Sequence, residues 1–198
     1  MKLGSTRRAI HDALTWGYQQ KGELGIVEWL KYLTKIEKSF RQDEWRTADF
    51  LEAGWILAAI NCLRPEVGAW LRYCYGVDNY ESDLQIVATF LFMANFLGRK
   101  KIDRYQALCK CAVDDYRSRI RIVKSMPAEA YVHAMQVNAS HFARDWKDPK
   151  NLCLDQLKSI DSEGIARVSM MVKYLRGERP DGRENETLTD ILEEIENS

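Results

Sequence analysis

Apolar residues recur along most of the chain at spacings of three and four residues. This is the period of an α-helix that packs one face on a core. Between residues 25 and 38, for example, Ile26, Trp29, Leu30 and Leu33 follow it. No run of alternating apolar and polar residues leads into an Asn-Gly or Asp-Gly turn, the usual signature of a β-hairpin. The pattern therefore predicts a compact, all-α, multi-helix fold.

Helix-capping and helix-breaking residues divide this pattern into separate helices. Pro65 suits the first turn of one helix, and Gly76 suits its end. The helix capped by Ser82 has a nearly uninterrupted apolar face, so we expect it to be central to the core. The expected longer helices are 6–20, 25–38, 44–63, 65–75, one from Ser82 to the break at 98–101, and a stretch from Asp103 to Ser125, and shorter helices begin at Pro127, Ser140 and Asp161.

Three parts are expected along the chain. Residues 1–125 form a helical domain that contains a basic helix, and residues 126–177 form a smaller helical subdomain. Residues 178–198 form a linker and a short acidic tail, because two Gly and one Pro stand among charges between 177 and 185. For the segment 138–172 we expect packing in the core or the subdomain rather than a chemical role.

Several classes of protein are excluded by composition. The longest apolar stretch, 86–97, is too short to span a membrane, and no signal-peptide core follows the amino terminus, so we expect a cytoplasmic protein. The five cysteines are odd in number and scattered, and they lack the paired spacing of a zinc site. We therefore expect small buried thiols, no disulfide framework, no metal and no cofactor.

Catalysis is not indicated by any motif. The chain has no Gly-rich phosphate loop, no His-Glu-x-x-His pair and no nucleophile elbow, and it holds only three histidines. Asp114 and Asp115 are adjacent, so on a helix they point about 100° apart and do not face each other. This favours helix capping and solvent exposure for the pair over a catalytic role, and we expect no enzyme.

Charge is distributed very unevenly, although the formal net charge is zero. From Arg99 to Lys124, nine basic residues stand against three acidic ones, whereas 178–198 has a net charge of −6. Arg117, Arg121 and Lys124 share one face of a helix at spacings of four and three, with Arg119 beside them, as in a helix that faces phosphates. The candidate DNA-binding residues are Arg99, Lys100, Lys101, Arg104, Arg117, Arg119, Arg121 and Lys124.

Two local structures are compatible with the basic stretch. In a helix-turn-helix, 105–111 forms a support helix, 112–113 a turn, and Asp114 caps a recognition helix whose Tyr116 and Ile120 face the core. In the alternative, a single continuous helix runs from Asp103 to Lys124, because no Gly or Pro interrupts it. The run 116–121 also resembles the closing helix of the promoter-reading domains of sigma factors.

A second resemblance extends over residues 29–120. The segments Leu63-Arg64-Pro65-Glu66, Trp70-Leu71 and Tyr73-Cys74-Tyr75-Gly76 follow in an order that resembles the antitermination protein Q families of lambdoid-type prophages. The chain departs from the family in two places: 87–96 replaces a short alanine-centred support helix, and the zinc-binding cysteine pairs of one branch are absent.

The resemblance implies a phage transcription antiterminator that binds DNA near a late promoter, loads onto RNA polymerase and acts without catalysis. The alternative is a helical protein-protein interaction module without nucleic-acid binding. In that case the basic helix docks an acidic partner or the chain's own acidic tail, or forms a solvated face with ion pairs.

Overall fold

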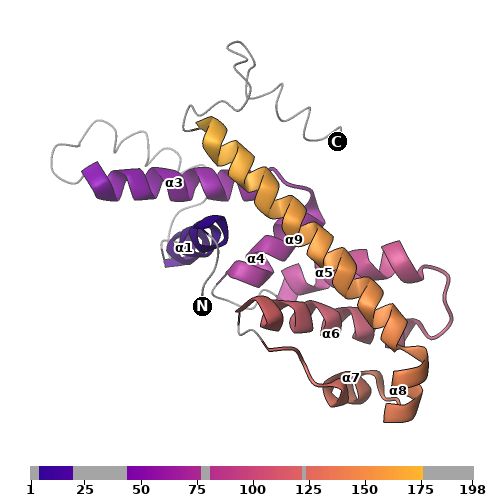
Figure 1. Cartoon of the computed structure of the whole chain (residues 1–198). Coiled ribbons are helices and arrows are strands. Elements are labelled where there is room, and N and C mark those ends of the chain that lie inside the picture. The colour runs from indigo at the N-terminus through magenta and orange to yellow at the C-terminus, as the bar shows by residue number, and fades with distance from the viewer. Residues whose placement is uncertain (1–4, 20–43, 77–80, 122–123, 176–198) are drawn as a thin grey trace.

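The computed structural model describes residues 5–19, 44–76, 81–121 and 124–175, and these residues form helices and no strand (Figure 1). The all-α prediction is therefore confirmed. The predictions for 25–38 and for the acidic tail lie outside the described residues. The helices are α1 (Ser5–Gln19), α3 (Glu44–Asn61), α4 (Pro65–Tyr75), α5 (Glu81–Phe96), α6 (Ile102–Arg121), α7 (Ala128–Met135), α8 (Ala139–Asp145) and α9 (Lys147–Leu175).

Local signals located several helix ends correctly. α4 begins at Pro65. Proline suits this position because the first turn of a helix does not use its backbone N–H groups in helical hydrogen bonds. At the other end, the Gly76 N–H donates a hydrogen bond to the Arg72 carbonyl oxygen at 2.8 Å. The predicted break between α5 and α6 is also present. There Gly98 and Lys101 both adopt positive φ angles, of 81° and 68°, and so reverse the chain direction. Ser82, however, lies inside α5 rather than capping it.

α9 is the central helix of the fold. It has 29 residues and is about 44 Å long, and it packs against α3, α4, α5 and α6 (Figure 1). The prediction of a short helix starting at Asp161 was wrong, because α9 runs through this position without a break. The core role expected for α5 was only partly correct, since Ile86, Met93 and Leu97 are exposed on or directly after it.

α4 and α9 approach each other closely at Gly164. A Cβ atom added there would lie 3.0 Å from Val67 Cγ1 and 3.1 Å from both methyl groups of Leu71. Nine in ten real Cβ contacts are wider than this, so any larger residue requires Val67 or Leu71 to move by a few tenths of an ångström. The small residue thus sets how deeply α4 sits against the central helix.

Asp161 joins three helices from within the core. Its carboxylate is buried and accepts hydrogen bonds from Trp70 Nε1 at 3.0 Å, from the Tyr75 hydroxyl at 2.8 Å and from an Arg7 guanidinium nitrogen at 2.6 Å. A buried charge requires such partners, and here they come from α1 and α4. The position and tilt of α1 therefore depend on a residue 154 positions away from Arg7 in the sequence.

The basic stretch forms one continuous helix, α6, and not a helix-turn-helix. Ala112 and Val113, the expected turn, are helical and completely buried. Tyr116 and Ile120 pack against the core as expected. The predicted turn is absent for two reasons. Packing of Ala112 and Val113 against other helices stabilises the helical conformation there, and no Gly or Pro favours a break.

Candidate nucleic-acid interface

The carboxy-terminal end of α6 is held in place by Asp115. This side chain is wholly buried and accepts two hydrogen bonds from the Arg119 guanidinium at 3.0 Å each, one from the Tyr131 hydroxyl at 2.8 Å and one from the Met126 N–H at 2.8 Å. Lys150 Nζ lies 3.2 Å from it. The partners belong to α6, α7, α9 and the connector 124–127, so Asp115 holds four segments together.

The solvent exposure expected for Asp115 was wrong. Asp115 follows Leu108 by seven residues and Cys111 by four, which places it on the buried face of α6. Burial alone raises the pKa of a carboxyl, but the hydrogen bonds from Arg119, Met126 and Tyr131 outweigh this effect and hold the pKa of Asp115 below its ordinary value of 3.8. The carboxylate is therefore ionised at neutral pH and serves as a structural anion.

Arg117 and Arg121 occupy a different face of α6, next to α4. The Arg117 guanidinium lies over the Tyr73 ring, 4.5 Å from its centre, and the Tyr73 hydroxyl donates a hydrogen bond to Asp114. Partial burial lowers the pKa of Arg121, and the positive charge of Arg117 lowers it further. The two guanidinium groups add positive charge to this side of α6, beside Tyr73 and the Asp114 carboxylate that Tyr73 binds.

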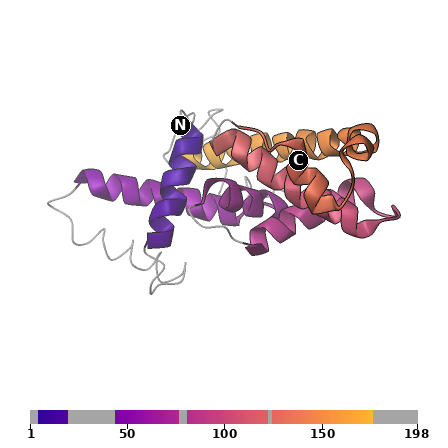
Figure 2. The same ribbon diagram turned by 90° about the horizontal axis from the view of Figure 1, so that it is seen from below.

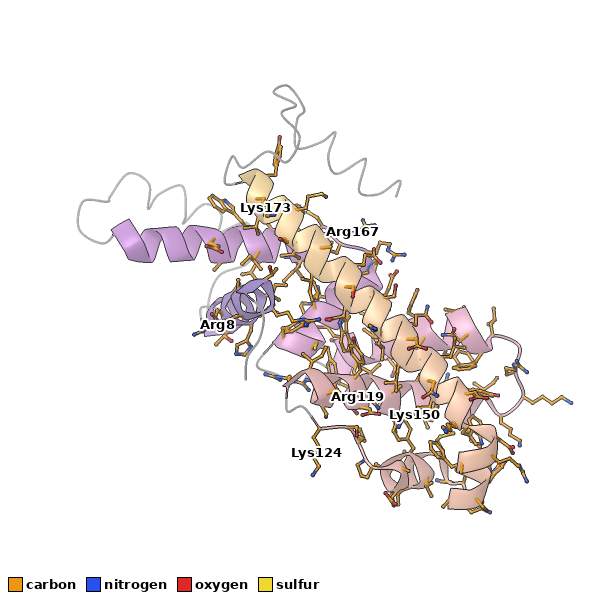
Figure 3. The ribbon with its side chains drawn as sticks, viewed as in Figure 1. Arg8, Arg119, Lys124, Lys150, Arg167 and Lys173 are labelled. Carbon is orange, nitrogen blue, oxygen red and sulfur yellow. The ribbon has the colours of Figure 1, made fainter. Side chains whose placement is uncertain are left out.

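Arg119 and Lys124 differ in how freely they can reach a ligand. Arg119 is held by Asp115, although 41% of its side chain is exposed. Lys124 is exposed and begins the described connector to α7, where Figure 3 shows it pointing away from the body of the protein. On the expected face of Arg117, Arg121 and Lys124, the two arginines are half-buried and Lys124 is exposed, whereas Arg119 is exposed but bound to Asp115.

The four remaining candidate residues lie at the opposite end of α6. Arg99, Lys100 and Lys101 are exposed in the turn after α5, and Arg104 is half-buried in the first turn of α6. Since α6 has 20 residues, about 30 Å separates this end from Arg121. Lys101 and Arg104 line a hollow of about 480 Å³ together with Asp103, Ala134, Met135 and Gln136. The structure therefore divides the predicted set into an amino-terminal cluster (Arg99, Lys100, Lys101, Arg104) and a carboxy-terminal cluster (Arg117, Arg119, Arg121, Lys124).

The sequence pattern did not reveal some charged residues of this region. Lys150 comes from α9 but lies over α6, with Nζ 4.1 Å from the centre of the Tyr131 ring (Figure 3). Counting charge along the chain cannot find it, because α6 and α9 are distant in sequence. A signal did exist for Asp115 and Asp161, since each is a lone acidic residue at an apolar phase of its helix.

The described residues contain no group of three or more metal-ligating side chains, and none of their helices is long and apolar enough to cross a membrane. Four of the five cysteines are buried, and Cys62 is exposed. Burial raises the pKa of the Cys111 thiol to about 11, so it is protonated at neutral pH. The cysteines of α6 and α9 thus behave as small apolar side chains.

The described residues thus form a helical body with buried ion pairs and with basic groups at both ends of α6. The sequence profile of a family described as phage antitermination protein Q matches residues 44–179, from the start of α3 to beyond the end of α9. The chain belongs to this family and is a phage-type antitermination regulator. No curated protein and no solved structure matches the chain.

Proposed function

We propose that this antitermination regulator binds DNA through α6, acts on RNA polymerase through other faces, and works in the cytoplasm without catalysis. The observation that carries the DNA proposal is the basic end of α6, where Arg117 and Arg121 lie one helical turn apart on a helix that Asp115 holds in place. A phosphate beside these guanidinium groups would accept charge-assisted hydrogen bonds, and the exposed Lys124 adds a further positive charge after the helix.

The two basic clusters suit one duplex. The two ends of α6 that carry them are about 30 Å apart, with about 20 Å between the nearest members, Arg104 and Arg117, and one turn of B-DNA is about 34 Å long. Contacts from both ends of the helix would therefore reach backbone phosphates roughly one helical turn apart. In this arrangement the carboxy-terminal cluster contributes Arg117, Arg121 and Lys124, and Arg119 positions the connector by binding Asp115.

The test is a titration of a fluorescent mixed-sequence duplex of about 30 base pairs with the full chain at several salt concentrations. Removal of one side chain that binds a phosphate reduces the slope of log affinity against log salt by about one. We expect the triple variant Arg117→Ala, Arg121→Ala, Lys124→Ala to lower that slope by about three and to weaken binding at least ~tenfold at low salt. The same slope as wild type would refute the assignment.

A matched control removes the same charge elsewhere. Lys147, Lys158 and Lys173 are exposed on α9, so their triple Ala variant also changes the net charge by −3. We expect it to keep most of the wild-type salt slope, because it leaves both clusters on α6 intact. If both triple variants reduce the slope equally, binding depends on overall charge and α6 has no special role.

Contact with RNA polymerase is tested separately. Purified bacterial RNA polymerase, immobilised, should retain the wild-type chain and also the α6 triple variant, since we propose a different face for this contact. Retention of neither protein would contradict the polymerase part of the proposal. If the wild-type chain also fails to bind the DNA duplex, a helical protein-protein interaction module becomes the better explanation of the basic helix.

A further inference from the structure

One side of α5 is both exposed and uncharged. The exposed fractions of Ile86, Met93 and Leu97 are 40%, 52% and 67%, and Phe90 is half-buried between them. No charged residue occurs from 84 to 98, and Asp83, directly before this run, is buried and bound to Arg72. Interface cores are depleted in charge in the same way, whereas ordinary helix surfaces are not.

These four side chains form a regular stripe. Positions 86, 90, 93 and 97 are separated by four, three and four residues, which is the spacing of the contact seam between two packed helices. The opposite side of α5 already packs on α4 and α6 through Leu84, Val87 and Leu91. α5 lies at the lower right edge of the ribbon in Figure 2, and Ile86, Met93 and Leu97 of the stripe are exposed to solvent.

The two ends of the stripe carry opposite charges. Glu81, whose side chain is 77% exposed, lies in the first turn of α5, and the exposed Arg99, Lys100 and Lys101 follow its last turn. A second α5 placed parallel would bring like charges together at both ends. An antiparallel second α5 brings Glu81 of one copy beside the basic turn of the other. The uncharged central parts of the two helices then face each other without charge repulsion.

We propose that α5 forms a two-fold, antiparallel interface with a second copy of this chain. Ile86 then packs on Leu97 of the second copy, and Phe90 packs on Met93 of the second copy. One helix face buries less than the roughly 800 Å² per partner of a standard interface, so we expect a weak dimer that dissociates at roughly micromolar concentration. The proposal does not depend on DNA binding.

Sedimentation velocity of the full chain from about 1 to 200 μM tests the association. We expect a concentration-dependent shift from monomer to dimer for wild type and a monomer throughout for Met93→Asp, Leu97→Asp. The control Leu152→Asp, Met170→Asp changes two exposed apolar residues of α9 and should dimerise as wild type does. Circular dichroism melting shows that each variant is folded. A wild-type monomer at every concentration, or a dimer unaffected by the α5 changes, would overturn the proposal.

Charge reversal tests the antiparallel orientation. Glu81→Arg alone, or Arg99→Glu with Lys100→Glu alone, should weaken the dimer about tenfold, and the combination should restore it. Lys110→Ala is the control for Glu81, because it removes the 3.6 Å ion pair between Lys110 and Glu81 without changing Glu81 itself. Additive weakening in the combined variant would refute the antiparallel pairing.

Discussion

Replacing Asp115 by Ala removes the acceptor that joins α6, α7, α9 and the connector between α6 and α7. The Tyr131 hydroxyl, which is buried, would lose its partner, and so would the Met126 N–H. Lys150, only 16% exposed, would keep its charge without the carboxylate 3.2 Å away. Arg119 can turn toward water because 41% of its side chain is exposed, so its contribution is discounted.

The expected loss is large because the remaining partners stay buried. An unsatisfied buried polar group costs about 1–3 kcal/mol, and breaking a buried charge pair costs about 3–5 kcal/mol. We therefore expect Asp115→Ala to lower the free energy of unfolding by about 3–5 kcal/mol. For a chain of this size each kcal/mol corresponds to about 2–4 °C, so Tm should fall by roughly 6–20 °C.

Urea denaturation followed by circular dichroism measures the loss, and hydrogen exchange locates it. The Met126 amide, bonded to Asp115 in the wild type, should lose protection more than the amides in the middle of α9. Asp155→Ala, at an exposed position of α9, is the matched control and should change stability by less than about 0.5 kcal/mol. A loss below about 1 kcal/mol for Asp115→Ala would contradict the structural role assigned to this carboxylate.

Two further predictions concern acid stability and helix packing. The pKa of Asp115 is lowered in the folded chain, so its contribution is present above the unfolded pKa of about 3.9 and is lost as pH falls through the folded pKa. Urea titrations between pH 7 and pH 3 should therefore show a steeper acid loss for wild type than for Asp115→Asn, and parallel curves would contradict this. Gly164→Ala places a Cβ 3.0 Å from Val67 and should destabilise the chain by about 1–3 kcal/mol, although alanine normally favours a helix by up to ~1 kcal/mol. A stabilised variant in thermal melting would show that α4 and α9 can separate without cost.

Residues close together in the sequence determined the fold class and several helix ends. The three- and four-residue periodicity, Pro65 and Gly76 act within one or two turns, and the structure follows them at α4. The family was indicated by a short ordered series of residues around the same helix, and the match over 44–179 confirms it. The eight candidate basic residues were found by counting charge, and their role in binding DNA stays a prediction.

Tertiary packing decided the features that depend on distant residues. α6 is one helix because Ala112 and Val113 are buried against other helices, and the local sequence allowed a turn as well. Asp115 and Asp161 are buried because partners on other helices satisfy them, and α9 rather than α5 became the central helix. These contacts stabilise the fold only when helices that are far apart in the sequence pack together. They therefore cannot be predicted from any short segment of the chain.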